Sequence, residues 1–169
     1  MRAWIVGACA ACLAVVPAAC REPVSYAGIE PGPRLSAWLP DSAAVLAHET
    51  VSGVGDSAWS VLGDSASWAQ LWSRLYGGRQ PQPPLPLVDF SRYRVVVAAM
   101  GSRGSSGYDV RVDSVVTYET GPVVYLVTVQ PGASCVTLAV ITAPVEVLRV
   151  PLLSSSFGFR ARNIVRDCQ

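Results

Sequence analysis

Apolar and polar residues alternate in short runs along most of the chain after position 44, with the period of two that is typical of β-strands. Glycine, proline and serine separate these runs at regular intervals, as turn residues do in all-β proteins. The strands that this pattern predicts are 45–51, 57–62, 94–100, 108–118, 123–129, 136–141, 145–150 and 157–161. Strands of this number and spacing predict an antiparallel β sandwich or barrel.

One segment has the period of a helix instead. Between Ala66 and Tyr76, large apolar residues recur three and four positions apart, so they share one face of an amphipathic helix: Trp68, Leu71, Trp72 and Leu75. Asp64 or Ser65 is expected to cap the first turn of this helix, and Gly77 and Gly78 to end it in the left-handed conformation. We therefore expect one helix near the N-terminal part of the domain, packed on the sheet through this face.

Two of the predicted strands lack simple alternation. Arg94–Met100 is almost continuously apolar, which predicts a central strand covered on both faces. In the strand 145–150 the apolar side switches between Val147 and Leu148, so this strand needs either a bulge or burial on both faces. The proline-rich stretch 79–86 cannot continue a helix or join a sheet interior. We interpret it as a stiff crossover from helix to strand, with a proline-rich ligand for an aromatic groove as the alternative.

Residues 1–19 have the composition of an export signal. One charge at Arg2 precedes an apolar stretch, and small residues follow it up to Cys20. The sequence Pro-Ala-Ala-Cys that ends at Cys20 resembles the lipobox of bacterial lipoproteins, in which the cysteine is lipidated and becomes the mature N-terminus. We therefore expect residues 20–42 to hold the lipidated cysteine and a proline-rich tether, and residues 43–169 to form one β-rich domain.

The cysteines outside the signal favour lipidation over plain secretion. Cleavage after Ala18 would leave three cysteines, and thus an odd thiol, in an oxidising compartment. Lipidation of Cys20 removes it from the count and leaves Cys135 and Cys168. These two either form a disulfide, or Cys135 is a buried apolar residue and Cys168 a free thiol. The sequence leaves both arrangements open.

The charge of the chain excludes one class of partner. Lysine and arginine number 13, aspartate and glutamate 12, and the net charge is +1. Proteins that bind nucleic acid have a strongly basic surface, which such a balanced composition does not supply. We therefore expect no nucleic-acid partner.

The sequence contains no recognisable catalytic combination of residues. His48 is the only histidine, so motifs that need two histidines are excluded, and so is a histidine-rich metal site. No Gly-x-Ser-x-Gly turn leads from a strand into a helix, the acidic residues lack calcium-loop spacing, and Cys135 has no CxxC partner. We expect no enzyme activity, no cofactor and no metal, and we interpret His48 as a structural or exposed residue.

Two loops carry the polar residues for which a packed core has no use. The first runs from Gly101 to Gly107 and ends at Tyr108, and the second spans Pro131–Cys135. Glycine lets a backbone approach a partner closely, and arginine and tyrosine are frequent in protein interfaces. The residues that we expect to bind a protein partner are Arg103, Ser105, Ser106, Gly107, Tyr108, Pro131, Gly132 and Ser134. The alternative is that Gly107 serves only the turn and Tyr108 begins a core-facing strand.

The motifs of this region occur together in a known family. The Ser-Gly-Tyr turn before a valine-alternating strand, the Pro-Gly-x-x-Cys loop and the closing Val-Leu-Arg-Val-Pro resemble the C-terminal domain of PrcB-like protease-complex proteins. The resemblance runs from about Trp59 to Pro151. Family members usually have Thr-Gly-Gly-Tyr where this chain has Ser105-Ser106-Gly107-Tyr108. The resemblance implies an envelope lipoprotein, periplasm-facing or on the cell surface, that binds and stabilises a protease complex.

Two other functions are compatible with the same residues. Chagasin-like inhibitors of cysteine proteases also present a Thr-Gly-Tyr loop from a β sandwich, and Ser106-Gly107-Tyr108 is similar to it, but their Arg-Pro-Trp loop has no counterpart here. The second alternative is an inert structural domain of the envelope whose loops bind nothing specific.

Overall fold

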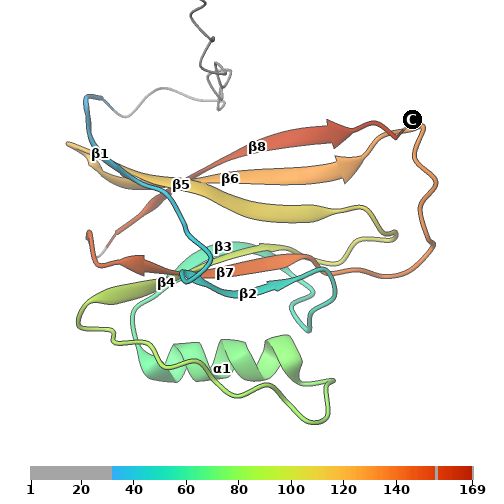
Figure 1. Cartoon of the computed structure of the whole chain (residues 1–169), viewed down its shortest axis with the longest axis horizontal. Coiled ribbons are helices and arrows are strands. Elements are labelled where there is room, and N and C mark those ends of the chain that lie inside the picture. The colour runs from blue at the N-terminus through green and yellow to red at the C-terminus, as the bar shows by residue number, and fades with distance from the viewer. Residues whose placement is uncertain (1–31, 155, 169) are drawn as a thin grey trace, which may run out of the picture.

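Most of the alternating runs form strands, and these strands build two β-sheets stacked face to face, with one helix on the outer side of the second sheet (Figure 1). The computed structural model describes residues 32–154 and 156–168. The elements follow the chain in the order β1 (Arg34–Trp38), β2 (Val45–Glu49), β3 (Ser57–Leu62), α1 (Ser65–Tyr76), β4 (Tyr93–Met100), β5 (Asp109–Tyr118), β6 (Gly121–Pro131), β7 (Val145–Pro151) and β8 (Gly158–Arg166).

The sheets remain separate, so the fold is a sandwich and not a closed barrel. The first sheet has the strand order β1-β5-β6-β8, and the second has the order β2-β7-β4-β3. This confirms the predicted fold class of a mainly β protein with one helix. One pair departs from antiparallel pairing, because β6 and β8 run parallel. A parallel pair needs a long crossover, and here the chain passes through β7 in the other sheet before it returns as β8.

The described residues form three clusters of buried side chains, and β4 contributes to the two larger ones, which form layers. One layer lies between the sheets, and the other lies between the second sheet and α1. Alternate residues of β4 enter each layer, Val96, Ala98 and Met100 between the sheets and Val95, Val97 and Ala99 beneath the helix. Its almost continuous apolar sequence is therefore explained by burial on both faces, as predicted.

β7 was expected to contain a bulge or to be buried on both faces, and the structure shows burial on both faces. Val145 and Val147 pack under the helix, whereas Leu148 and Val150 pack between the sheets. The strand is thus buried on both faces. The irregularity belongs to its neighbour, because the register between β2 and β7 shifts between Val45 and Ala47.

The helix packs on the sheet through its predicted face. Trp68 and Trp72 are 2% and 5% exposed, and both belong to the apolar layer beneath α1. The Asp64 carboxylate caps the first turn by accepting a hydrogen bond of 2.8 Å from the Ser67 amide. Both indole N–H groups donate to carbonyl oxygens of the proline-rich stretch 79–86, which therefore acts as a crossover that lies along the helix.

The predicted left-handed end of the helix is wrong. Gly77 has φ −58° and ψ −23°, which is right-handed, and Gly78 is not among the residues with positive φ. Side chains secure this end instead. The Tyr76 hydroxyl donates to Glu49 Oε1 at 3.0 Å, and Arg79 Nη2 lies 2.6 Å from Glu49 Oε2. A glutamate of β2 thus holds the last turn, so a special glycine conformation is not required.

The predicted strand 136–141 is also wrong. The residues form no regular element, and Val136, Leu138 and Ile141 are 100%, 71% and 73% exposed. A period-two pattern gives a strand only where a neighbouring strand and a core face exist, and this segment spans from the first sheet to the second. Figure 1 shows this connection between β6 and β7 at one end of the sandwich.

The N-terminal boundary of the domain needs correction. The tether was expected to extend from residue 20 to residue 42, but β1 (Arg34–Trp38) pairs antiparallel with β5 and belongs to the first sheet. Trp38 packs against the layer between the sheets. The prolines on either side of this strand favoured a tether, but the packing of Trp38 makes the strand part of the domain. The export signal 1–19, Cys20 and the tether up to residue 31 lie outside the described residues.

Candidate binding site

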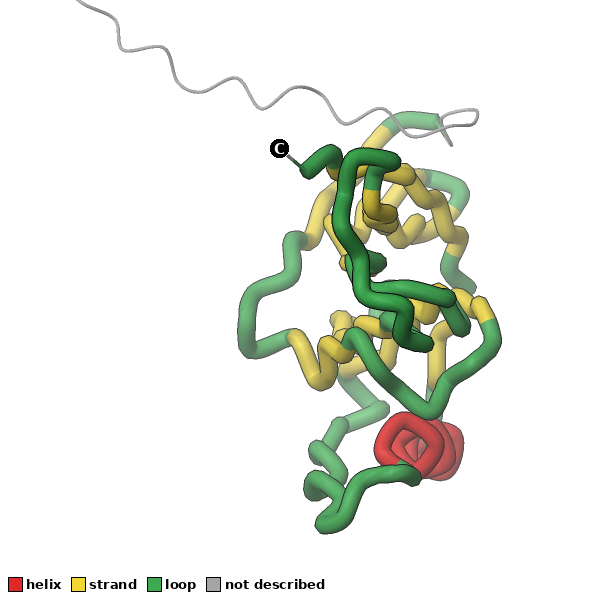
Figure 2. Tube along the Cα trace, turned by 90° about the vertical axis from the view of Figure 1, so that its right-hand side faces the viewer, coloured by secondary structure: helices red, strands yellow, loops and turns green. Residues whose placement is uncertain are grey.

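The two predicted loops lie at the same end of the sandwich, which faces the viewer in Figure 2. Gly107 of the first loop has φ +95°, and a Cβ atom added there would lie 3.1 Å from the Cβ atom of Pro131 in the second loop. A side chain at position 107 is therefore opposed by both the backbone conformation and the contact with Pro131. Glycine lets the loops pack against each other, so they form one surface.

Arg103 and Tyr108 are neighbours within the first loop. The guanidinium carbon of Arg103 lies 5.7 Å from the centre of the Tyr108 ring, within the range of a cation–π contact. The Arg103 backbone exchanges hydrogen bonds of 2.7 and 2.9 Å with Thr142. The Nε atom of Arg103 is buried and has no hydrogen-bond partner in the described part of the chain. The backbone of this residue is fixed, while its side chain retains an unused donor.

Ser105 and Ser106 hold the chain that connects β6 to β7. The Ser105 carbonyl accepts a hydrogen bond of 2.9 Å from the Thr142 hydroxyl. The Ser106 amide donates to the Leu138 carbonyl at 3.0 Å, and the Leu138 amide donates to the Ser106 hydroxyl at 2.9 Å. The Ser105 carbonyl and both the amide and the hydroxyl of Ser106 are thus engaged within the protein, where they fix the exposed connection to the first loop.

The second loop contacts the C-terminal tail. Cys135 and Cys168 form a disulfide across a sequence separation of 33 residues. Next to it, the Gly132 amide donates a hydrogen bond of 2.8 Å to the Arg166 carbonyl. A Cβ atom on Gly132 would collide with the Asp167 carboxylate, so the tail lies directly over this glycine. Ser134 stays exposed in the turn.

Residues 136–141, which we call the exposed segment, belong to this surface although they were not predicted to be there. Their apolar side chains point to solvent: Val136, Leu138, Val140 and Ile141. A pocket between the loops is bordered by Ser106, Gly107 and Pro131 together with Val136 and the disulfide. The signal for this role is a strand-like pattern directly after the Pro-Gly-x-x-Cys loop, and the sequence alone cannot tell such a segment from a paired strand.

A cleft of about 340 Å³ opens between the two sheets beside the first loop. Arg103 and Tyr108 line it, and so does Trp59, which is 41% exposed. On β6 the residues that face the other sheet change from apolar Val124 and Leu126 to polar side chains as the strand approaches this end. The polar residues that line the cleft are Ser57, Thr128, Gln130 and Asn163. The interior of the sandwich thus becomes hydrophilic at the loop end.

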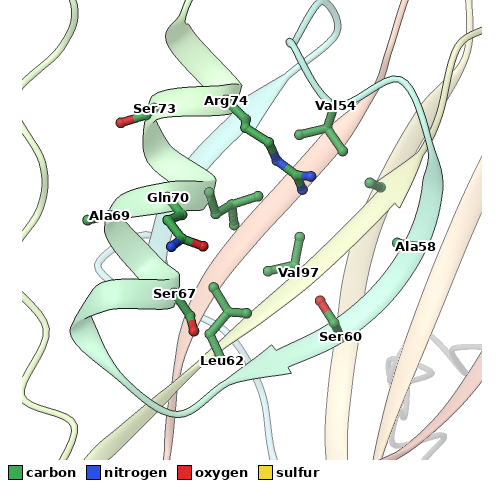
Figure 3. A pocket seen from close by; sticks show the side chains of 12 residues that line it. Val54, Ala58, Ser60, Leu62, Ser67, Ala69, Gln70, Ser73, Arg74 and Val97 are labelled. Atoms are coloured by element: carbon green, nitrogen blue, oxygen red, sulfur yellow. The ribbon is translucent and has the colours of Figure 1, made fainter.

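A larger groove of about 730 Å³ runs between α1 and β3 on the outer face of the second sheet (Figure 3). Gln70 and Arg74 extend from the helix across it, and Val97 forms part of its floor. The helix covers β4 and β7 but leaves the outer face of β3 open. Sequence analysis did not identify this groove, because it depends on where the helix crosses the sheet.

His48 is a structural residue that links the two sheets. Its Nε2 atom lies 3.0 Å from Asp109 Oδ1, and its Nδ1 atom lies 3.2 Å from Glu146 Oε1. Burial raises the pKa of Glu146, and a hydrogen bond from the Val112 amide and the nearby His48 partly oppose this shift. Arg111 in turn pairs with Asp109 at 3.0 Å. Both ring nitrogens of His48 therefore face carboxylates.

The described residues contain no group of three or more metal-ligating side chains suited to hold an ion. Within residues 32–154 and 156–168, no helix has the length and apolar character needed to cross a membrane.

Part of the chain matches a known protein family. The model described as PrcB C-terminal matches residues 94–151, from β4 to the end of β7. This range includes both predicted loops and the exposed segment, whereas the part of the expected resemblance between Trp59 and Tyr93 lies outside it. Comparisons with curated proteins and with solved structures find no match. The match of residues 94–151 to the PrcB C-terminal model agrees with the resemblance that the motifs of this region predicted.

Proposed function

We propose that this protein is a non-enzymatic lipoprotein of the cell envelope that binds and stabilises a protease or another protein complex. The observation that carries the proposal is the family match, because residues 94–151 include both loops and the exposed segment that follows the second loop. The resemblance to PrcB-like protease-complex proteins suggests association with a protease. An accessory protein acts by binding its partner, so its affinity has to come from an exposed surface.

The loop end supports binding because it combines exposed apolar side chains with aromatic and cationic ones. Val136, Leu138 and Ile141 are exposed, and the segment that carries them is hydrogen-bonded to the first loop, which holds Arg103 and Tyr108. Exposed apolar residues that cluster, as these do, are typical of protein-interaction sites. Arginine and tyrosine are enriched among the residues that contribute most to binding.

Binding by itself accounts for stabilisation of the partner. A protein that binds the folded state of its partner, and not the unfolded state, raises the free energy of unfolding of that partner by mass action. No covalent chemistry is needed. Export and lipidation at Cys20 would place the domain where an envelope protease is found, facing the periplasm or on the cell surface.

Capture of envelope proteins tests the proposal. The wild-type domain is compared with the double variant Arg103→Ala, Tyr108→Ala and with Val136→Asp, whose side chain is fully exposed and whose replacement leaves the core intact. We expect both variants to lose most of the captured protein, since central interface residues contribute ~2 kcal/mol or more. Val136→Asp should also retain its melting temperature, whereas the double variant should lower it because Tyr108 packs against the layer between the sheets. Arg34→Ala, which pairs with Tyr118 at the other end of the first sheet, is the matched control and should bind normally.

The outcome also decides among the alternatives. Equal capture by the wild type and both variants would favour the alternative of an inert structural domain. Inhibition of a cysteine protease by the purified domain, in an assay against a protease panel, would favour the chagasin-like function instead.

A further inference from the structure

The sandwich has four outer strands, and three of them carry features that discourage pairing with another chain. Outer strands expose unpaired backbone N–H and C=O groups, and natural proteins protect them with bulges, prolines or charged side chains. β1 has a register shift between Arg34 and Ser36, and β2 has one between Val45 and Ala47. β8 carries three arginines, Arg160, Arg162 and Arg166.

β3 is the outer strand without such protection. Its residues, Ser57–Leu62, include no charge and no proline, and they pair with β4 without any register shift. The first half of the strand is exposed, and in the described part of the chain no strand lies along its other edge. A regular, uncharged edge of this kind is a template for one more strand.

Both faces of β3 border a hollow that could receive the side chains of an added strand. On the outer face, Ala58, Ser60 and Leu62 line the groove beneath α1 (Figure 3). On the inner face, Ser57 and Trp59 line the cleft between the sheets. Because side chains of a strand alternate between faces, a segment paired with β3 would direct every second side chain into each hollow.

Each hollow presents one cation and no acidic residue. Arg74 extends into the groove, and its guanidinium has no hydrogen bond or ion pair within the described residues (Figure 3). Arg103 borders the cleft, with its buried Nε atom unpaired. The charge on both sides of β3 is therefore complementary to carboxylate side chains.

We propose that β3 binds an extended segment of a partner protein as an additional β-strand, with one acidic side chain of that segment facing Arg74 and another facing Arg103. This deepens, and rests on, the proposed function. The edge is continuous with the loop end, since the Ser102 amide donates a hydrogen bond of 2.9 Å to the Gly55 carbonyl just before β3. One partner would thus contact the loops and the strand together.

Synthetic peptides test this mode of binding without the native partner. The probe is a peptide of about six residues, the length of an ordinary strand, built from threonine and valine with two adjacent glutamates that face opposite sides. Its matched control carries lysines in place of the glutamates. Amide hydrogen exchange of the domain is measured over residues 57–62 with each peptide.

We expect the glutamate peptide, and not the lysine peptide, to slow exchange along β3. Arg74→Glu should weaken the glutamate peptide by about tenfold and improve the lysine peptide, because it reverses the charge of one hollow. Arg34→Glu, on a different outer strand, should change neither. Absence of protection at residues 57–62, equal protection by the two peptides, or protection unchanged in Arg74→Glu would overturn the proposal.

The result is distinguishable from failure of the proposed function. If the loop variants lose envelope partners while the glutamate peptide leaves β3 unprotected, the protein binds its partner without strand addition. If the glutamate peptide protects β3 but the loop variants capture envelope proteins as well as the wild type does, then the β3 edge binds acidic strands and the proposed accessory function is wrong.

Discussion

The indole groups of the helix show how polar atoms are accommodated in the core. Trp68 and Trp72 pack edge to face with ring centres 5.1 Å apart. Their N–H groups donate to the carbonyl oxygens of Pro86 and Pro83, both at 2.9 Å. A buried indole N–H without a partner would destabilise the fold. The proline-rich stretch therefore contributes to the core through its backbone.

Replacement of Trp72 tests the weight of this packing. Trp72→Ala should lower the free energy of unfolding by about 3–5 kcal/mol, because it opens a cavity under the helix and leaves the Pro83 carbonyl without its donor. Chemical denaturation measures the change. Trp59→Ala is the matched control, since Trp59 is 41% exposed and should cost much less. A similarly small decrease in the free energy of unfolding for both substitutions would show that packing of the helix face contributes little to stability.

Glu146 gives the stability of the domain a defined dependence on pH. Burial raises the pKa of this carboxyl above its ordinary value of 4.5, so the folded state binds the proton more tightly than the unfolded state. The corresponding stabilisation is present below pH 4.5 and is lost as the pH rises through the folded-state pKa.

A comparison with Glu146→Gln isolates this contribution. We expect the free energy of unfolding of the wild type, measured relative to the variant, to fall as the pH is raised from about 4.5 through the raised pKa of Glu146. Asp89→Asn is a control with the opposite sign, because hydrogen bonds from Ser91 lower the pKa of this exposed carboxyl. A difference between wild type and Glu146→Gln that does not vary with pH would contradict the expectation.

Among the elements, the connection between β6 and β7 depends on a covalent restraint. The disulfide joins its beginning at Cys135 to the tail at Cys168, and hydrogen bonds to Ser105 and Ser106 hold its later part. A disulfide that closes a loop of this length typically contributes about 2–4 kcal/mol. Cys135→Ser, Cys168→Ser should therefore lose about that much stability in denaturation experiments.

The same variant has a second readout at the loop end. Exchange of amides in the exposed segment 136–141 should increase more than exchange in β4, because only the segment loses its anchor. A reducing agent should reproduce both effects in the wild type and none in the double variant. Unchanged stability after reduction would mean that hydrogen bonds alone hold the connection.

Elements were predictable where local pattern and tertiary contact agree. β3 begins and ends at the predicted residues, and α1 has the predicted apolar face, because each satisfies its own periodicity against a real neighbour. The exposed segment 136–141 has the same kind of pattern but no neighbouring strand. β1 has the reverse combination, since proline-rich flanks suggest a tether while Trp38 packs in the core. Whether each of these two segments forms a strand depends on a neighbouring strand that is distant in sequence.

At the scale of the whole molecule, the candidate site was only partly accessible to prediction. The two loops were identified from glycines and polar residues, but their contact through Gly107 and Pro131 requires the sandwich. The contact of His48 with Asp109 crosses from one sheet to the other, and its contact with Glu146 joins two strands that are distant in sequence, so neither leaves a trace in local sequence. The groove at Arg74 arises from the angle at which a helix crosses a sheet. Features created by the stacking of layers were therefore missed.

Attachment of the molecule to a membrane is the remaining prediction. Cys20 lies outside the described residues, but the disulfide between Cys135 and Cys168 accounts for the other two cysteines beyond the export signal. An unmodified Cys20 would then be a single free thiol in an oxidising compartment. We therefore expect Cys20 to be lipidated and to anchor the domain to the membrane.

Metabolic labelling with a fatty-acid probe checks this expectation on the full chain. The wild type should incorporate the label and sediment with membranes, and Cys20→Ser should do neither. Cys12→Ser changes a cysteine within the export signal and should leave labelling intact, which controls for effects of the substitution on export. A soluble, unlabelled protein whose N-terminus is Ala19 would show cleavage by an ordinary signal peptidase instead. The domain would then reach its partner by diffusion, and its affinity would have to come from the loop end and the β3 edge alone.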